Sequence, residues 1–177
     1  IATYRCDIRD ASAVEEMYDL IWRDQPLTGL INNAAGNFIA RSETLSANAV
    51  DSILGTVLHG TAYCTIAAGK RWIEEKSAGT IISIVATAAM NGRAFSMPSA
   101  AAKAGVLAMM RSLAVEWGRH SIRTISVAPG FFPTEGAWSR LYPPGSVSEA
   151  QSAEVPLGRL GDHGEISNLV AFLFSDM

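Results

Sequence analysis

The sequence is poor in cysteine, in net charge and in long apolar runs. Its two cysteines, Cys6 and Cys64, are too few for a disulfide framework and lack the spacing of a metal site, which suits a reducing compartment such as the cytoplasm. No apolar run reaches the roughly 18 residues of a membrane-spanning helix. The net charge is −3 and the basic residues are scattered, so no nucleic-acid groove is indicated. We therefore expect no metal, nucleic-acid or membrane partner.

The composition is that of a single globular domain. Hydrophobic residues make up 49% and charged residues 18% of the 177 residues, enough apolar material for a buried core. Segments with the pattern of buried strands alternate with segments of helical period. The predicted strands cover residues 2–6, 27–36, 79–89 and 122–130. The predicted helices cover residues 10–24, 46–75, 98–120 and 162–176, the second and last with Ser46 and Asp162 as N-caps.

This alternation predicts the fold class, an α/β domain with a doubly wound parallel sheet of the Rossmann type. In such sheets ligands bind at the carboxyl ends of the strands, so the residues that follow each predicted strand are the candidates for chemistry. The segment 131–161 is rich in proline and glycine and has no sustained period. Because connections of this length usually serve function, we predict that it is a substrate loop or lid.

Several segments follow one another in an order and spacing that resemble a known family. They read INNAAGNF (31–38), PSAAAKAG (98–105), LAVEWG (113–118), APGFFPTEGAWSRL (128–141) and GRLGDHGEISNLVAFLFSD (158–176). Together they resemble the short-chain dehydrogenase/reductases, and more narrowly their 2,4-dienoyl-CoA reductase branch, over nearly the whole chain. The family pattern also has a Gly-rich phosphate loop after its first strand and a further strand at its end. We expect these to precede residue 1 and to follow residue 177, so that the chain holds part of one domain.

The resemblance implies an oxidoreductase of fatty acid metabolism that uses NADP, or alternatively NAD. Its substrate would be an acyl-CoA-type molecule, and it would work as a homodimer or homotetramer. Asp7 would bind the adenine amino group, Asn33 would form part of the floor under the cofactor, and Lys103 would bind the ribose hydroxyls. The segment facing the nicotinamide would comprise Pro129, Gly130, Phe131, Phe132 and Thr134. Turn, cap and surface roles are the structural alternatives for all of these residues.

The catalytic residues implied by the resemblance are Asn37, Ser99 and Lys103. Asn37 would donate a hydrogen bond to the thioester carbonyl and stabilise the negative charge that hydride transfer places there, by about 3 kcal/mol. Ser99 stands one helical turn before Lys103 and would bind the substrate or a water. The implied substrate-binding residues are Arg9, Phe38, Ser46 and Arg140. The structural alternatives are a surface or loop position for Arg9, Arg140 and Asn37, core packing for Phe38, and helix capping for Ser46 and Ser99.

The sequence departs from the family pattern at the proton donor. Ala88 stands where the branch would have its catalytic tyrosine, eleven residues before Ser99, and a methyl group donates no proton. Ala86, with Thr87 beside it, stands where many relatives have a serine, and His59 replaces an asparagine of the long helix. Three functions remain open: a dienoyl- or enoyl-CoA reductase that takes its proton from water, a reductase of another carbonyl with Thr87, His59 or Ser99 as the acid, or a non-catalytic member of the family.

Overall fold

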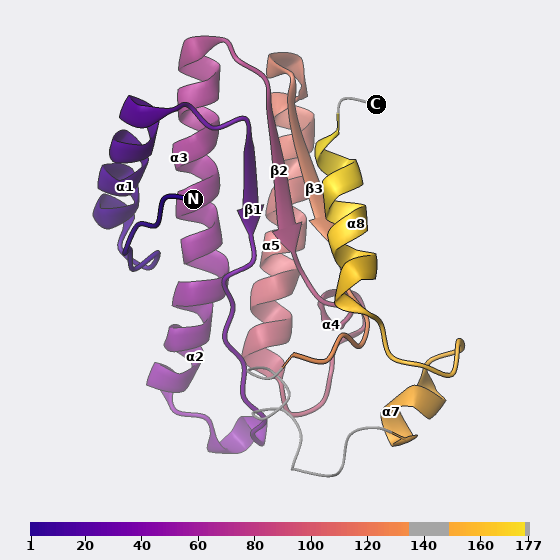
Figure 1. The fold of residues 1–177 in the computed structure, drawn as a ribbon. Helices are drawn as coiled ribbons and strands as arrows, with labels where there is room; N and C mark the ends of the chain where they lie inside the picture. Colours follow the sequence, from indigo (N-terminus) through magenta and orange to yellow (C-terminus); the bar gives the residue numbers. More distant parts are fainter. Residues whose placement is uncertain (135–148, 176–177) are drawn as a thin grey trace.

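The computed structural model describes residues 1–134 and 149–175 and contains a three-stranded parallel sheet (Figure 1). The strands β1 (Gly29–Asn32), β2 (Gly79–Ile84) and β3 (Ile122–Val127) lie in the order β1-β2-β3. Gly29 pairs with Thr80, and Gly79 pairs with Ile122. All three strands therefore point the same way, and their carboxyl ends meet at one edge, as the sequence predicts.

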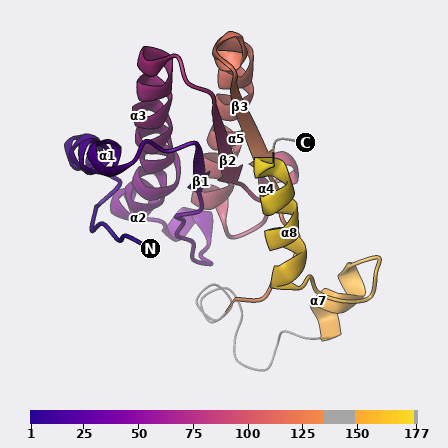
Figure 2. The same cartoon turned by 45° about the horizontal axis from the view of Figure 1, so that its top comes forward.

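Helices cover both faces of this sheet, which confirms the predicted fold class (Figure 2). On one face lie α3 (Gly60–Glu75) and α5 (Met97–Trp117), and the Trp72 ring of α3 packs directly against Gly79. On the other face lies α8 (His163–Phe174), whose Phe174 ring packs against Gly29. Both strand glycines are needed because a Cβ atom would lie 2.4 Å from Trp72 in one case and 2.5 Å from Phe174 in the other.

The helix ends follow from local chemistry. Asp10 caps α1 (Ala11–Asp24) by accepting hydrogen bonds from the backbone N–H groups of Ser12 and Ala13. Ser46 caps α2 (Ala47–Leu54), and Asp162 with Glu165 forms a capping box at the start of α8. The predicted helix 46–75 is not uniform, because a π-helical turn, η2 (Gly55–His59), joins α2 to α3. The remaining short elements are η1 (Ser42–Thr44), α4 (Ala88–Asn91), η3 (Gly118–His120) and α7 (Glu149–Glu154).

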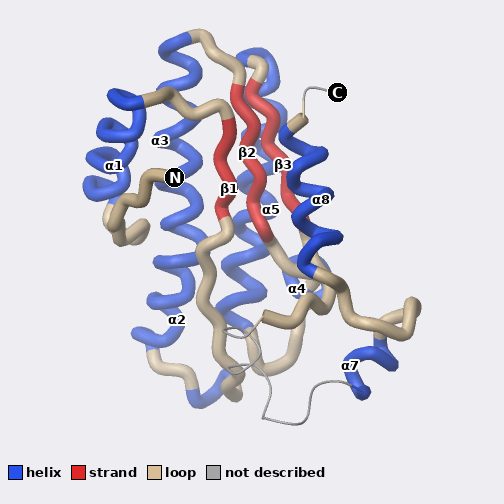
Figure 3. Tube along the Cα trace, viewed as in Figure 1, coloured by secondary structure: helices blue, strands red, loops and turns tan. Residues whose placement is uncertain are grey.

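The predicted strand at residues 2–6 is wrong, because residues 1–10 form no strand in the structure (Figure 3). Cys6 and Ile8 instead pack against the main hydrophobic core. Ile8 lies so close to the long helix that a Cβ atom at Gly60 would be 2.6 Å from its side chain. Ala2 and Tyr4 are exposed, so only Cys6 of the predicted strand contributes to the core. The predicted loop 131–161 also contains the helix α7, which its composition did not indicate.

The core between the sheet and the helices α3 and α5 depends on a close approach at Gly69. A Cβ atom there would lie 2.4 Å from the Trp117 ring, which is buried. We expect Gly69→Ala to lower the free energy of unfolding by about 2 kcal/mol, because overpacking outweighs the better helix propensity of alanine. Gly118→Ala is the matched control, since Gly118 has a helical φ of −55° and no atom within 4 Å of the added Cβ. Urea unfolding measures both, and equal stabilities would contradict the packing argument.

Candidate active site

A cavity of about 450 Å³ lies at the carboxyl ends of β2 and β3, at the edge of the sheet where α4 and α7 also lie (Figure 1). Its walls come from the segment after β2, the segment after β3 and the end of α7. The lining residues are Ala86, Thr87, Ala88, Asn91, Gly92, Arg93, Pro129, Gly130, Phe131 and Glu154. Gly92 has φ +72° and follows α4, so it turns the chain back toward the start of α5.

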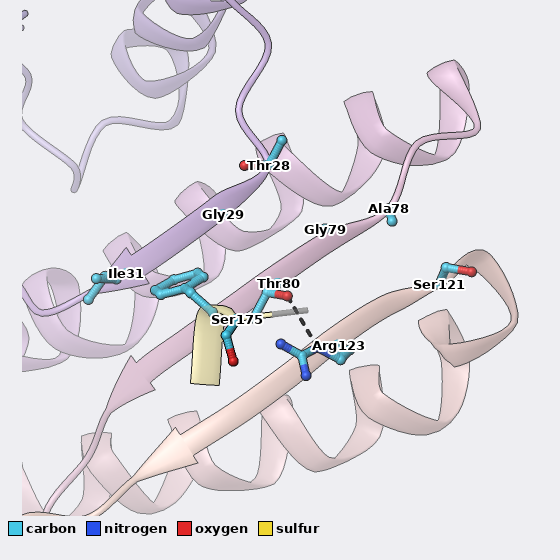
Figure 4. Close-up of a pocket in the computed structure, with 10 residues that line it drawn as sticks. Thr28, Gly29, Ile31, Ala78, Gly79, Thr80, Ser121, Arg123 and Ser175 are labelled. Atoms are coloured by element: carbon cyan, nitrogen blue, oxygen red, sulfur yellow. Dashed lines mark hydrogen bonds between the residues drawn. The ribbon is translucent and has the colours of Figure 1, made fainter. Parts of the chain in front are cut away.

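A larger cavity, of about 940 Å³, lies at the opposite end of the sheet (Figure 4). It is formed by residues at the amino ends of the strands and by Phe174 and Ser175. Among its described lining residues only Arg123 is charged, and its guanidinium already donates hydrogen bonds to the Thr80 hydroxyl and to the Leu173 carbonyl. Because the chemistry of parallel α/β sheets is found at the carboxyl ends of strands, the smaller cavity is the better candidate site despite its size.

Lys103 is buried near the carboxyl end of β2, the strand that leads into the wall of the smaller cavity. It lies on α5, is only 8% exposed, and its Nζ donates a hydrogen bond to the Ile84 carbonyl at 2.5 Å. Ile84 ends β2 and is two residues from Ala86 in the cavity wall. Burial lowers the pKa of Lys103 from its usual 10.5 to about 8, because the charged ammonium has lost its hydration. The structural alternative, a solvated helix lysine, is therefore excluded, and Lys103 is a buried amine at the carboxyl end of a strand.

The loop after β1 carries Asn37 and is tied to the loop before α5. The Asn37 Oδ1 atom accepts a hydrogen bond from the Phe38 N–H at 2.9 Å, which fixes the orientation of the amide. The Phe38 ring packs against a small apolar cluster that includes Ile53 and Ala102. The Ala40 N–H donates to the Phe95 carbonyl at 3.0 Å, and Phe95 is held at φ +63°, an uncommon conformation for a bulky residue. These contacts hold the Asn37 loop beside the amino end of the helix that carries Ser99 and Lys103.

Asn32, the last residue of β1, has a structural role that the sequence did not indicate. Its Nδ2 donates to the Thr65 hydroxyl at 2.9 Å and to the Ser83 hydroxyl at 3.2 Å. Thr65 is on α3 and Ser83 on β2, and both are buried. Asn32 thus joins two strands and a helix immediately before the predicted cofactor floor, whereas Asn33 is exposed. A buried hydrogen-bonded cluster of this kind fixes the position of the backbone at Asn33, which is predicted to lie against the cofactor.

Asp7 and Arg9, which the resemblance assigns to different ligands, form an ion pair with each other. The Arg9 guanidinium donates to both Asp7 carboxylate oxygens, from Nε to Oδ1 at 2.9 Å and from Nη2 to Oδ2 at 2.6 Å. The same contacts lower the pKa of Asp7 to about 2, chiefly through the hydrogen bond from Arg9. Both side chains remain about half exposed, at 53% for Asp7 and 55% for Arg9. Each therefore has an exposed side that can meet a ligand.

The other predicted residues are placed as follows. Pro129, Gly130 and Phe131 line the cavity, whereas the Phe132 ring packs against Gly161. Thr134 is exposed and Ser99 is half-buried on α5. The Ser46 hydroxyl accepts from the Ala49 N–H as a helix cap, so its capping role is confirmed. Arg140 lies outside the described residues.

The candidates for a replacement acid are Thr87, His59 and Ser99, and of these only Thr87 is among the described lining residues of the cavity. Thr87 lines the cavity, together with Ala86 and Ala88. His59 does not line it: the imidazole is exposed on η2, with its ring centroid 6.2 Å from that of Tyr63. Three polar lining residues, Asn91, Arg93 and Glu154, stand in no sequence motif, and only the folded chain brings them together.

Among residues 1–134 and 149–175, no group of three or more histidine, cysteine or acidic side chains is placed to hold a metal ion. Within the same residues, no helix is both long and apolar enough to cross a bilayer.

Comparisons with known proteins place the chain in a family. The family model described as Enoyl-(Acyl carrier protein) reductase matches residues 1–177. The chain is 44% identical over 177 residues to a Caenorhabditis elegans protein named "Probable 2,4-dienoyl-CoA reductase 3", with 98% of this chain and 57% of that protein covered. It is 42% identical over 178 residues to a Bacillus subtilis (strain 168) protein named "Probable 2,4-dienoyl-CoA reductase", with 99% of this chain and 70% of that protein covered.

A crystal structure of a short chain dehydrogenase from Bacillus anthracis superimposes with a TM-score of 0.86 at 44% sequence identity, over 97% of this chain and 67% of that one. The chain spans little more than half the length of the nematode proteins that it matches. The match of the family model to the whole chain and the identity to these relatives show that the chain belongs to the short-chain dehydrogenase/reductase family and resembles its 2,4-dienoyl-CoA reductases.

Proposed function

We propose that the chain is part of an NADP-dependent oxidoreductase that delivers hydride to an enoyl or dienoyl thioester. The observation that carries the proposal is the buried amine of Lys103 at the carboxyl end of β2. The segment that follows this strand lines a cavity together with Pro129, Gly130 and Phe131 of the predicted nicotinamide-facing segment. The names of the relatives at 42–44% identity support the substrate class.

The residues present fit a nicotinamide coenzyme. Lys103 uses one of its three donors on the Ile84 carbonyl, which leaves donors for the ribose hydroxyls. Asn33 and the small residues Ala34 and Ala35 are exposed at the end of β1, so a flat group can approach the backbone there. Asp7 would accept from the adenine amino group while it keeps its contact with Arg9. When bound, the coenzyme supplies the hydride.

The protein groups then stabilise the charge that hydride addition creates. Addition of hydride to the conjugated system moves an electron pair onto the thioester oxygen. Asn37 is suited to donate to this oxygen, because its Oδ1 is occupied by the Phe38 N–H and its orientation is thereby set. Water then gives a proton to a carbon of the resulting enolate and leaves hydroxide, which solvent neutralises. Ser99 would bind the thioester or that water, and Phe38, Arg9, Ser46 and Arg140 would contact the rest of the acyl-CoA.

The test is an assay of the intact protein with NADPH and 2,4-dienoyl-CoA or 2-enoyl-CoA substrates. We expect NADPH to be consumed and the reduced acyl-CoA to be recovered in equal amount, with lower kcat/KM when NADH replaces NADPH. No consumption with any such thioester would defeat the proposal.

A second function is favoured by one observation, the position of Thr87. Its hydroxyl lines the cavity next to Ala86 and could serve as proton donor for a ketone or aldehyde. A screen of such carbonyl compounds separates the two functions. Arg9→Ala and Arg140→Ala should lower kcat/KM for CoA esters only, because a simple carbonyl has no phosphate to bind.

The proposal includes a homodimer or homotetramer in the cytoplasm. Ile66 on α3 is 51% exposed and Val115 on α5 is 87% exposed, so both helices present apolar side chains away from the sheet. Both cysteines are free thiols, which suits a reducing compartment. Light scattering of the intact protein measures the assembly, and a monomer would refute this part of the proposal.

A further inference from the structure

We propose that Arg93 stabilises the negative charge that develops on the thioester oxygen, in the part of the cavity beside Ala88. This inference rests on the proposed function, because it concerns the charge formed when the thioester is reduced. Arg93 lines the same cavity as Ala88, and it is the only cation among the described lining residues. The other polar groups of that lining are the Thr87 hydroxyl, the Asn91 amide and the Glu154 carboxylate.

The backbone places Arg93 next to the space that the missing phenol would fill. The single turn of α4 begins at Ala88 and is closed by a hydrogen bond from the Gly92 N–H to the Ala88 carbonyl, at 3.0 Å. Gly92, at φ +72°, then turns the chain, and Arg93 follows as an exposed residue of the cavity lining. The Arg93 carbonyl accepts from the hydroxyl of Ser96, which is buried, at 3.2 Å. The backbone under the guanidinium is therefore fixed at both ends.

The chemistry of the lining favours charge stabilisation over proton donation. A guanidinium keeps its proton throughout the accessible pH range, so Arg93 cannot be the acid. The guanidinium can direct two N–H groups toward an oxygen that becomes negative, in the same role that is proposed for the amide N–H of Asn37. The hydride adds to the far carbon of the conjugated system, the electron pair reaches the oxygen near Arg93, and water protonates carbon. Arg93 is thus a catalytic residue by electrostatics, and the proton balance involves water alone.

The first test compares kinetic constants of the intact protein. We expect Arg93→Met to lower kcat about 100-fold with KM changed less than about threefold, because one donor to a developing oxyanion is lost. Arg93→Lys keeps the positive charge but not the paired N–H donors of the guanidinium, so its kcat should fall only about tenfold. Arg119→Met is the matched control: Arg119 is exposed on η3, at the amino end of β3, and its removal should leave kcat unchanged. A rise in KM alone, or a loss confined to substrates that carry a carboxylate, would overturn the proposal.

A second measurement needs no turnover. A 3-oxoacyl-CoA ionises to an enolate with its own ultraviolet absorbance, and this enolate has the same negative thioester oxygen. We expect the bound enolate fraction near neutral pH to be about tenfold higher for the wild-type protein than for Arg93→Met. An equal fraction in the two proteins would overturn the role of Arg93 even if no reductase activity is found, whereas absence of turnover alone counts only against the proposed function. Circular dichroism confirms that each variant is folded, and Arg93→Lys replaces Arg93→Met if that variant is not.

Discussion

Replacing Ala88 with tyrosine is expected to raise kcat for a dienoyl-CoA substrate by 100- to 1000-fold, the range found for one donor to a developing oxyanion. Ala88 lines the cavity and begins α4, so a phenol at this position would point into a space bounded by Thr87, Arg93 and Phe131. The phenol would also add a second hydroxyl donor beside that of Thr87. Steady-state consumption of NADPH by the intact protein measures the gain.

The control for this gain is Ala89→Tyr, which adds the same phenol one residue along α4, at a position outside the cavity lining. It should leave kcat unchanged. A further expectation concerns Arg93, because a phenol and a guanidinium that act on one oxygen are partly redundant. The loss caused by Arg93→Met should therefore be smaller in the Ala88→Tyr background than in the wild type. Cofactor binding without turnover, in both the wild type and Ala88→Tyr, would instead favour the non-catalytic member of the family.

The sequence predicts those parts of the fold that depend on local chemistry. The caps at Ser46 and Asp162 depend on side chains that bond to backbone within three residues, so their position can be inferred from sequence order alone. The buried strands β2 and β3 depend on apolar β-branched runs and are likewise found. The prediction for segment 2–6 fails because a short alternating pattern does not say whether the segment pairs with other strands. In the structure residues 2–5 are exposed, and only Cys6 packs against the core.

The candidate site was predictable where it lies at strand ends and not where it depends on tertiary contacts. Pro129 and Gly130 follow β3 directly, and both line the cavity. The pairing of Asp7 with Arg9, and the contacts of Asn32 with two hydroxyls, involve geometry that spacing does not encode. Arg93 illustrates the same limit, because an arginine in a loop reads as a solvated residue until the turn at Gly92 brings it to the cavity.

Lys103→Met is expected to abolish turnover and at the same time to stabilise the fold. The loss in kcat/KM should exceed about 1000-fold, because both the ribose contact and the local positive charge disappear. For stability, the lowered pKa means that the folded state disfavours the charged amine. The decrease in the pKa from 10.5 to about 8 corresponds to a cost of about 3 kcal/mol for the buried charge at pH 7, which Lys103→Met removes. The variant also loses the hydrogen bond to Ile84, which destabilises it by about 1 kcal/mol. We expect a net gain of about 2 kcal/mol in the free energy of unfolding.

The pH dependence separates this effect from ordinary packing. Below pH 8 Lys103 is charged in both the folded and the unfolded state, so the cost of burying the charge is present in full. Between pH 8 and 10.5 the folded state binds fewer protons than the unfolded state, and the wild-type protein gains stability as the pH rises. The advantage of Lys103→Met should therefore shrink across this window, while Lys70→Met, at an exposed position on α3, shows no such change. Urea unfolding at several pH values measures it. If the difference in free energy of unfolding between Lys103→Met and the wild type stayed constant from pH 8 to 10.5, the buried charge would not be the cause of that difference. Packing of the side chain would then account for it.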